Sequence, residues 1–117
     1  MLLSQDQQAL RELASRFARE RLRPGYQQRE NEGGIDRALC REMGALGLVG
    51  ADLPEAYGGM GLSGVAAGLI VEDIAYGDFN VSYVQLLASL MGTIIARNAA
   101  PELARAWVPR LVAGDAI

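Results

Sequence analysis

Apolar residues recur every three to four positions near the start of the chain, which is the spacing of one face of an α-helix. Ser4 and Gln7 can close a capping box around its first turn. Pro24 and Gly25 are expected to end this helix, because neither residue continues a helical pattern. Residues 26–34 are polar and predict an exposed connection. The apolar positions of this first helix are Leu10, Leu13, Ala14, Phe17 and Ala18.

Caps and helix breakers predict two more helices of the same amphipathic kind. Asp36 can cap one of them, and Gly47 can end it in the left-handed conformation. Pro101 suits the first turn of the other, which Gly114 ends. Pro109 removes one backbone hydrogen bond, so we expect it to kink or split this last helix.

Two further helices, in the middle of the chain, are apolar on nearly every side. Ser63 can cap the first, which runs to about Gly77, and Asn80 can cap the second, which runs to about Arg97. Helices of this kind are usually buried, so we expect both in the core. Residues 79–96 carry no charge and reach the lower edge of transmembrane length. Polar side chains interrupt them, however, and a core helix is predicted with no membrane span.

The expected fold is therefore all-α: a bundle of five to six helices with one longer Gly/Pro-rich loop at residues 48–62. No stretch of alternating polarity predicts a β-strand. The chain has 117 residues, 50% of them hydrophobic, which is enough for a single domain with one core.

Composition and charge exclude several classes of function. The net charge is −3, and the basic residues are interleaved with acidic ones, so we expect no nucleic-acid binding. The chain has no histidine, which removes the commonest general base and a common metal ligand, and we assign no metal site. Cys40 is the single cysteine and reads as a small core residue in a reduced, cytoplasmic protein.

Residues 59–64 read GMGLSG and match the G-x-G-x-x-G pattern ahead of a helix. One interpretation is a loop that holds the phosphates of a dinucleotide. The other is a tight loop whose glycines permit positive φ angles. We favour the second, because residues 48–53 make a poor strand and Pro54 separates them from the glycines.

Two adjacent carboxylates, Glu72 and Asp73, lie on the third predicted helix. Neighbours in sequence do not face each other on a helix, so they do not form an acid–base pair. A buried carboxylate here would need a partner such as an arginine, and we expect a structural role.

A narrow polar stripe, formed by Ser82, Gln85, Ser89 and Thr93, runs along the second apolar helix. The stripe has two interpretations. It can pack against a neighbouring helix, with its hydroxyls bonded to the preceding turn. Alternatively, it can form the wall of a mostly apolar pocket with a few polar groups. The pattern alone favours packing.

The sequence LPEAYGGMGL at residues 53–62 resembles the P-E-x-Y-G-G-x-G-L signature loop of acyl-CoA dehydrogenases. Residues 43–48 resemble the stretch before that loop, and residues 71–75 resemble an apolar-E-E-apolar-A segment of the same family. Residues 101–115 resemble the segment that closes the N-terminal helical domain of these enzymes. Residues 78–81 suggest the cyclohexanecarboxyl-CoA branch. The resemblance covers essentially the whole chain, but only the N-terminal domain of the family.

This resemblance implies a larger enzyme, in which a β-domain and a C-terminal helical domain follow. Such enzymes oxidise an acyl-CoA thioester to the 2,3-enoyl-CoA: a carboxylate removes the α-proton while the β-hydride passes to FAD. Electrons then pass to an electron-transfer flavoprotein, and a homo-oligomer, a tetramer or a dimer, is implied. The flavin-contacting segment and the catalytic carboxylate of the family have no counterpart in residues 1–117. We therefore assign no catalytic residue and no flavin ligand, and FAD is not expected to bind this chain alone.

In the family, the helix that matches residues 80–96 helps to line the acyl-chain pocket. The resemblance therefore implies four substrate-binding residues: Ser82, Gln85, Leu86 and Ser89. If the polar stripe faces the pocket, its hydroxyls and amide suit a short, branched or cyclic acyl group. An alternative hypothesis of a different class is a stand-alone, non-catalytic helical module that binds a partner or a lipid-like ligand.

Overall fold

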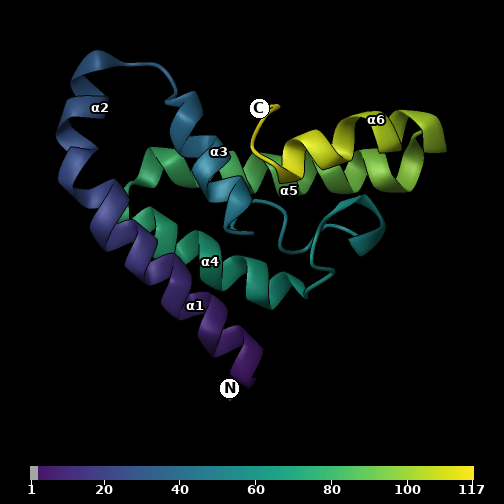
Figure 1. The fold of residues 1–117 in the computed structure, drawn as a ribbon, viewed down its shortest axis with the longest axis horizontal. Coiled ribbons are helices and arrows are strands. Elements are labelled where there is room, and N and C mark those ends of the chain that lie inside the picture. The colour runs from purple at the N-terminus through teal and green to yellow at the C-terminus, as the bar shows by residue number, and fades with distance from the viewer. Residues whose placement is uncertain (1–2) are drawn as a thin grey trace.

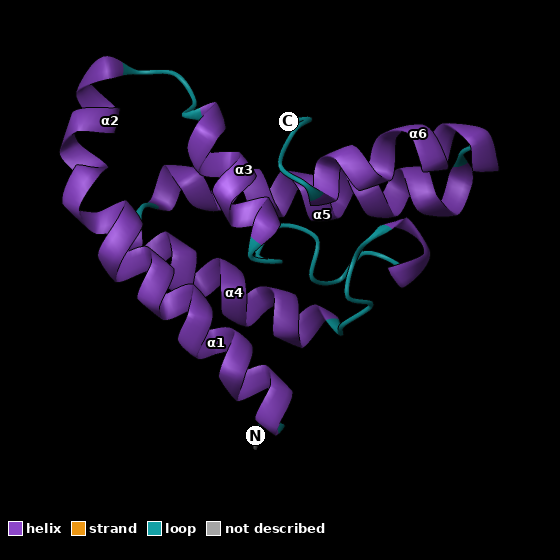
Figure 2. Ribbon diagram, viewed as in Figure 1, coloured by secondary structure: helices purple, strands orange, loops and turns teal. Residues whose placement is uncertain are grey.

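The computed structural model describes residues 3–117 and confirms the all-α prediction, since this part of the chain contains six α-helices and no strand (Figure 2). The helices are α1 (Gln5–Phe17), α2 (Tyr26–Glu32), α3 (Arg37–Ala45), α4 (Gly64–Gly77), α5 (Phe79–Asn98) and α6 (Pro101–Val112). The molecule is a slab that measures 41 × 37 × 18 Å. Figure 1 shows α1 beside α4 and α6 beside α5, with α3 crossing in front of the N-terminal half of α5.

The predicted helix starts are confirmed with one exception. Ser4 and Gln7 form the capping box of α1, Asp36 caps α3, and Ser63 caps α4. The exception is α5, where Asp78 and not Asn80 is the cap. The Asp78 carboxylate accepts hydrogen bonds from two backbone amides of the first turn, so the helix begins two residues earlier than the sequence predicted.

The first helix does not end at Pro24, contrary to the prediction. The chain continues from α1 through a π-helical turn (Ala18–Leu22) and a 3-10 turn (Arg23–Gly25) directly into α2. Pro24 is tolerated because it occupies the first turn of a new helical segment, where its missing amide hydrogen is not needed. The polar residues that were expected to form an exposed connection therefore form α2, which is rich in good helix formers.

The last helix also differs from its prediction, because Pro109 does not split it. Helix α6 runs unbroken from Pro101 to Val112 with Pro109 inside it. Gly114 follows with a φ of 77°, as expected for the residue that ends a helix.

The core has a larger part between α1, α3, α4 and the segment that joins α3 to α4, and a smaller part where Leu53 of that segment packs against α6. Its largest fully buried apolar side chains are Leu22, Met43, Leu48, Val49, Leu53, Ile70, Ile74 and Val108. Three of them belong to the loop at residues 48–62, so this loop is a structural layer of the core. Cys40 is buried, and burial raises the pKa of its thiol, which agrees with its prediction as a small core residue.

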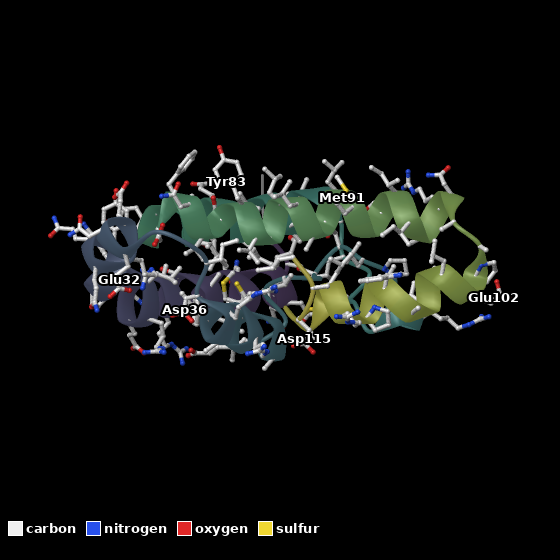
Figure 3. The ribbon with its side chains drawn as sticks, turned by 90° about the horizontal axis from the view of Figure 1, so that it is seen from above. Glu32, Asp36, Tyr83, Met91, Glu102 and Asp115 are labelled. Carbon is white, nitrogen blue, oxygen red and sulfur yellow. The ribbon has the colours of Figure 1, made fainter. Side chains whose placement is uncertain are left out.

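Helices α4 and α5 are not the fully buried core helices that the sequence predicted. Helix α4 buries one side, along Ala66, Ile70 and Ile74, and leaves Val65 and Tyr76 exposed. Helix α5 is the one helix in residues 3–117 that is long and apolar enough to cross a membrane, and only 28% of its apolar stretch is buried. Figure 3 shows why: α5 forms an outer layer, and no other described element covers its far side.

Candidate functional site

The most prominent surface feature is an apolar face on α5. Six large apolar side chains, each 44 to 50% exposed, recur at helical spacing and point away from the domain. Figure 3 shows Tyr83 and Met91 projecting from this side of the helix. We call this surface the outer face of α5, and it consists of Tyr83, Leu86, Leu87, Leu90, Met91 and Ile94.

A groove runs along one edge of this outer face. Its volume is about 160 Å³. Tyr83, Leu87 and Met91 form its α5 side, and Leu111 and Ile117 form the opposite side. Because almost all of these side chains are apolar, the groove is suited to a hydrocarbon group and not to a charged one.

The opposite side of α5 carries the polar residues. Gln85 is fully buried, and its Nε2 atom donates a hydrogen bond to the carbonyl oxygen of Ala67 in α4 at 3.1 Å. Ser82 donates to the carbonyl of Phe79 at 2.6 Å. We call this surface the inner face of α5, and it consists of Ser82, Gln85, Ala88, Ser89 and Gly92.

Ser89 connects the inner face to the loop at residues 48–62. Its hydroxyl donates to Asp52 Oδ2 at 2.5 Å. The other carboxylate oxygen of Asp52 and the Oε1 atom of Gln85 are buried without a hydrogen-bond partner. The inner face is therefore a packing surface whose polar groups are only partly satisfied.

The four residues predicted to bind substrate do not come together on one surface. Leu86 lies on the outer face, whereas Ser82, Gln85 and Ser89 lie on the inner face. Substrate contact stays a prediction for all four. The other outer-face residues were not predicted to bind substrate, although they recur at helical spacing. A helix that is apolar on nearly all sides gives little sign of which side is exposed.

The glycine-rich loop is closed on itself. The backbone amides of Met60, Gly61 and Leu62 donate to the carbonyl oxygens of Gly50, Leu53 and Ala51. A side chain at Gly59 would place its Cβ only 2.1 Å from the carbonyl oxygen of Leu53. The amides are thus unavailable to phosphate, and the interpretation as a tight structural loop is confirmed.

The adjacent carboxylates of α4 face α1. Arg11 Nε lies 3.4 Å from Asp73 Oδ2, and Arg11 Nη2 lies 3.8 Å from Glu72 Oε1. Burial is the main cause that raises the pKa of Asp73, and Arg11 opposes it only in part. In the described part of the chain, no group of three or more cysteine and acidic side chains could hold a metal ion.

Neither the glycine-rich loop nor the hollow at the start of α5 offers free groups for the diphosphate of a flavin. The amides of residues 59–62 are already paired with backbone carbonyls. A hollow of about 460 Å³ between α2, α3 and the start of α5 has one arginine, Arg29, which is bound to Asp78. No cation is left in this hollow to neutralise a diphosphate, so we assign no flavin ligand within this chain.

Comparisons with known proteins identify the family of this chain. The family model for the acyl-CoA dehydrogenase N-terminal domain matches residues 4–115. Mitochondrial isovaleryl-CoA dehydrogenase of Pongo abelii is 32% identical over 119 residues, which cover 98% of this chain and 28% of that enzyme.

Two solved structures have the same fold. A glutaryl-CoA dehydrogenase from Mycobacterium smegmatis in complex with FADH2 matches with a TM-score of 0.90 and 29% identity, over 98% of this chain and 30% of the other. A chain in a structure of the electron transferring flavoprotein of Acidaminococcus fermentans matches with a TM-score of 0.87 and 29% identity, over 98% and 30% of the two chains. This chain therefore spans less than a third of each protein that it matches here, and it belongs to the acyl-CoA dehydrogenase family as an N-terminal domain.

Proposed function

We propose that this chain is the N-terminal domain of a longer, flavin-dependent enzyme that oxidises an acyl-CoA thioester to the 2,3-enoyl-CoA. In this proposal, the outer face of α5 forms one wall of the acyl pocket. A β-domain and a C-terminal helical domain follow this one and supply the flavin site and the catalytic carboxylate.

The observation that carries the proposal is the exposed apolar surface of α5 in a chain of this family. Six large apolar side chains half exposed to water are costly, since full burial of such a side chain is worth about 1.5 to 3 kcal/mol and about half of that is still to be gained for each. An acyl pocket is a reason to keep such a surface uncovered within the domain.

The four predicted substrate-binding residues divide into two groups under this proposal. Leu86 contacts the acyl group directly, together with its outer-face neighbours Tyr83 and Leu87. Ser82, Gln85 and Ser89 hold α5 in place from behind, because their side chains bond to its own first turn, to α4 and to the loop.

The acyl group is expected to be apolar and compact. The groove beside the outer face has a volume of about 160 Å³, which favours a short, branched or cyclic group over a long chain. The preference for a compact acyl group therefore rests on the size of the groove. It does not rest on the hydroxyl groups of Ser82 and Ser89, because those hydroxyls face inward. A six-membered ring, as in the cyclohexanecarboxyl-CoA branch, belongs among the compounds to be tested.

The proposed activity also implies a cofactor, an electron acceptor and an oligomeric state. We propose FAD as the hydride acceptor, an electron-transfer flavoprotein as the electron acceptor, and a dimer or tetramer of the full-length protein in the cytoplasm. The similarity to a chain in an electron transferring flavoprotein structure supports the second of these partners.

The test uses the full-length protein and measures the bleaching of its flavin absorbance by a series of acyl-CoA thioesters. Leu86→Gln and Leu87→Gln should each raise KM by about tenfold, because losing about 1.4 kcal/mol of apolar contact changes affinity tenfold. The matched inner-face variants Gln85→Leu and Ser89→Ala should change the acyl preference less than the outer-face variants do. Wild-type protein that no acyl-CoA bleaches would refute the activity. A changed preference in the inner-face variants alone would move the acyl wall to the other side of α5.

A further inference from the structure

A buried ion pair ties α2 to the start of α5. Arg29 Nε lies 2.9 Å from Asp78 Oδ2, and the two residues are 49 positions apart in the sequence. The side chain of Asp78 is 3% exposed and that of Arg29 is 19% exposed. Every other ion pair in residues 3–117 has at least one partner that is more than a third exposed.

Asp78 uses its two carboxylate oxygens for different tasks. Oδ1 accepts from the amides of Asn80 at 3.0 Å and Val81 at 3.3 Å, and so caps α5. Oδ2 accepts from Arg29. The end of α5 is therefore held by a charged group whose own position is fixed from another helix.

Arg29 is fixed as well. It also donates to the backbone carbonyl of Leu22, at the end of the π-helical turn. A side chain at Gly25 would place its Cβ 2.7 Å from Arg29 Nη1, so glycine leaves the space that the guanidinium group occupies. Figure 1 shows the outcome: the bent segment from α1 to α2 reaches around the N-terminal end of α5.

The ion pair lies next to the proposed acyl wall. Arg29 and Asp78 line the hollow of about 460 Å³ at this end of the domain. That hollow shares Ile35, Asn80 and Val84 with the apolar groove beside the outer face. A shift of the first turn of α5 would therefore move lining residues of both spaces.

We propose that Arg29 and Asp78 are positioning residues that fix the first turn of α5 and, through it, the end of the acyl groove formed by Asn80, Tyr83 and Val84. The inference rests on the proposed function of the groove. It adds a specific role for a charge pair that touches neither the acyl group nor the flavin.

The proposal predicts a selective kinetic effect. Acyl groups that reach the Tyr83 end of the groove should lose affinity when the pair is broken, while groups too short to reach it should not. A small displacement of the pocket wall weakens its contacts with the acyl group strongly. We therefore expect KM to rise about tenfold for the longer acyl groups, while kcat for the shortest group stays unchanged.

The experiment compares four variants of the full-length protein with the wild type across an acyl-CoA series. Asp78→Asn keeps an oxygen that can cap α5 but removes the charge, and Arg29→Met removes the other partner. The double variant removes both, so no buried charge is left unpaired. Glu42→Gln is the matched control, because it breaks the exposed pair with Arg21, whose two bonds are 2.8 and 2.9 Å long.

The double variant separates positioning from simple stability. Its melting temperature should recover toward that of the wild type, because the unpaired charge is gone, while the acyl selectivity stays lost. Selectivity that returns together with stability would overturn the proposal. Any loss of selectivity in Glu42→Gln as large as in Asp78→Asn would also overturn it.

Hydrogen exchange provides a readout that does not need turnover. The amides of Asn80 and Val81 should exchange faster in Arg29→Met than in the wild type, while those in the middle of α5 keep their rates. Unchanged exchange at both amides refutes the positioning role, even for a protein that no acyl-CoA reduces. A wild type without acyl-CoA activity and with faster exchange in Arg29→Met would refute the proposed function and keep the positioning of α5.

Discussion

The two sides of α5 have the reverse of the usual polarity of a surface helix. The inner face carries Gln85 and two serines, and Gln85 is completely buried. The outer face carries leucines, a tyrosine, a methionine and an isoleucine that are about half exposed. In an ordinary amphipathic helix the apolar side faces the core and the polar side faces water.

This reversal shows that the two sides of α5 are suited to different surroundings. The inner side packs closely against α4 and the loop, where small residues allow a close approach and a few hydrogen bonds fix the register. The outer side is built for a second apolar environment that residues 3–117 do not supply. Each side can be tested separately.

The largest effect should come from filling the inner face. A Cβ atom at Gly92 would lie 2.7 Å from a methyl carbon of the fully buried Leu53. Gly92→Leu should therefore lower the free energy of unfolding by about 3 kcal/mol or more, through overpacking. Urea unfolding followed by circular dichroism measures this change. The adjacent outer-face variant Met91→Leu should stay within about 0.5 kcal/mol of the wild type, and an equal loss in both variants would contradict the distinction between the faces.

The next effect concerns the outer face of the isolated chain. We expect the chain to self-associate through this face, because contact with a second copy removes apolar surface from water. The double variant Leu87→Gln/Leu90→Gln should weaken this association at least about tenfold and change the free energy of unfolding by less than about 0.5 kcal/mol. Light scattering over a concentration series provides the measurement. A wild-type chain that stays monomeric at every concentration would count against the prediction.

A smaller effect is expected when the buried polar group of the inner face is replaced by an apolar group of the same volume. Gln85 makes one hydrogen bond to Ala67, and its Oε1 atom has no partner. Gln85→Leu has nearly the same volume and removes the unsatisfied oxygen, so the free energy of unfolding should change by less than about 1 kcal/mol. Gln85→Ala leaves a cavity and should cost about 2 to 4 kcal/mol, by analogy with other large buried side chains. Equal losses in both variants would assign the hydrogen bond a dominant role.

The smallest change in the free energy of unfolding is expected at Asp73, a largely buried carboxylate on α4, the helix that packs against the inner face. Because burial raises the pKa of Asp73, folding favours its protonated form. Below the pKa of Asp73 in the unfolded chain, the raised pKa does not lower the stability of the fold. Its cost in free energy of unfolding grows as the pH rises from that value and is complete above the pKa in the folded chain. Asp73→Asn should therefore stabilise the domain at neutral pH by less than about 1 kcal/mol, with no gain near pH 3. Unfolding curves at several pH values test this, and a gain that persists at low pH would point to another cause.

Much of the fold was predictable from local signals. Ser4, Asp36 and Ser63 cap helices as predicted, because capping depends on residues only a few positions apart. Pro24 and Pro109 misled the prediction, because a proline's effect depends on whether its turn begins a segment or is held by packing.

The candidate site was harder to predict than the fold. Leu86 and Gln85 are neighbours on an apolar helix, yet one is about half exposed and the other is fully buried. Which side faces the core depends on α4 and on the loop at residues 48–62, and these contacts join residues that are far apart in the sequence. Hydrophobic periodicity would bury the more apolar side of α5, and that side is the one that faces outward.

The first half of the loop between α3 and α4, residues 48–53, is buried almost throughout, which has a consequence for limited proteolysis. A protease must draw several residues of extended backbone into its active site, and loops are the usual place where this happens. Here Leu48, Val49, Ala51 and Leu53 are fully buried, and the amides of residues 60–62 are paired with carbonyls of residues 50–53. The short linker with Gly33, Gly34 and the 61% exposed Ile35 is open instead. The first cut in the native domain should therefore fall in this short linker, and residues 48–53 should stay intact until the domain unfolds.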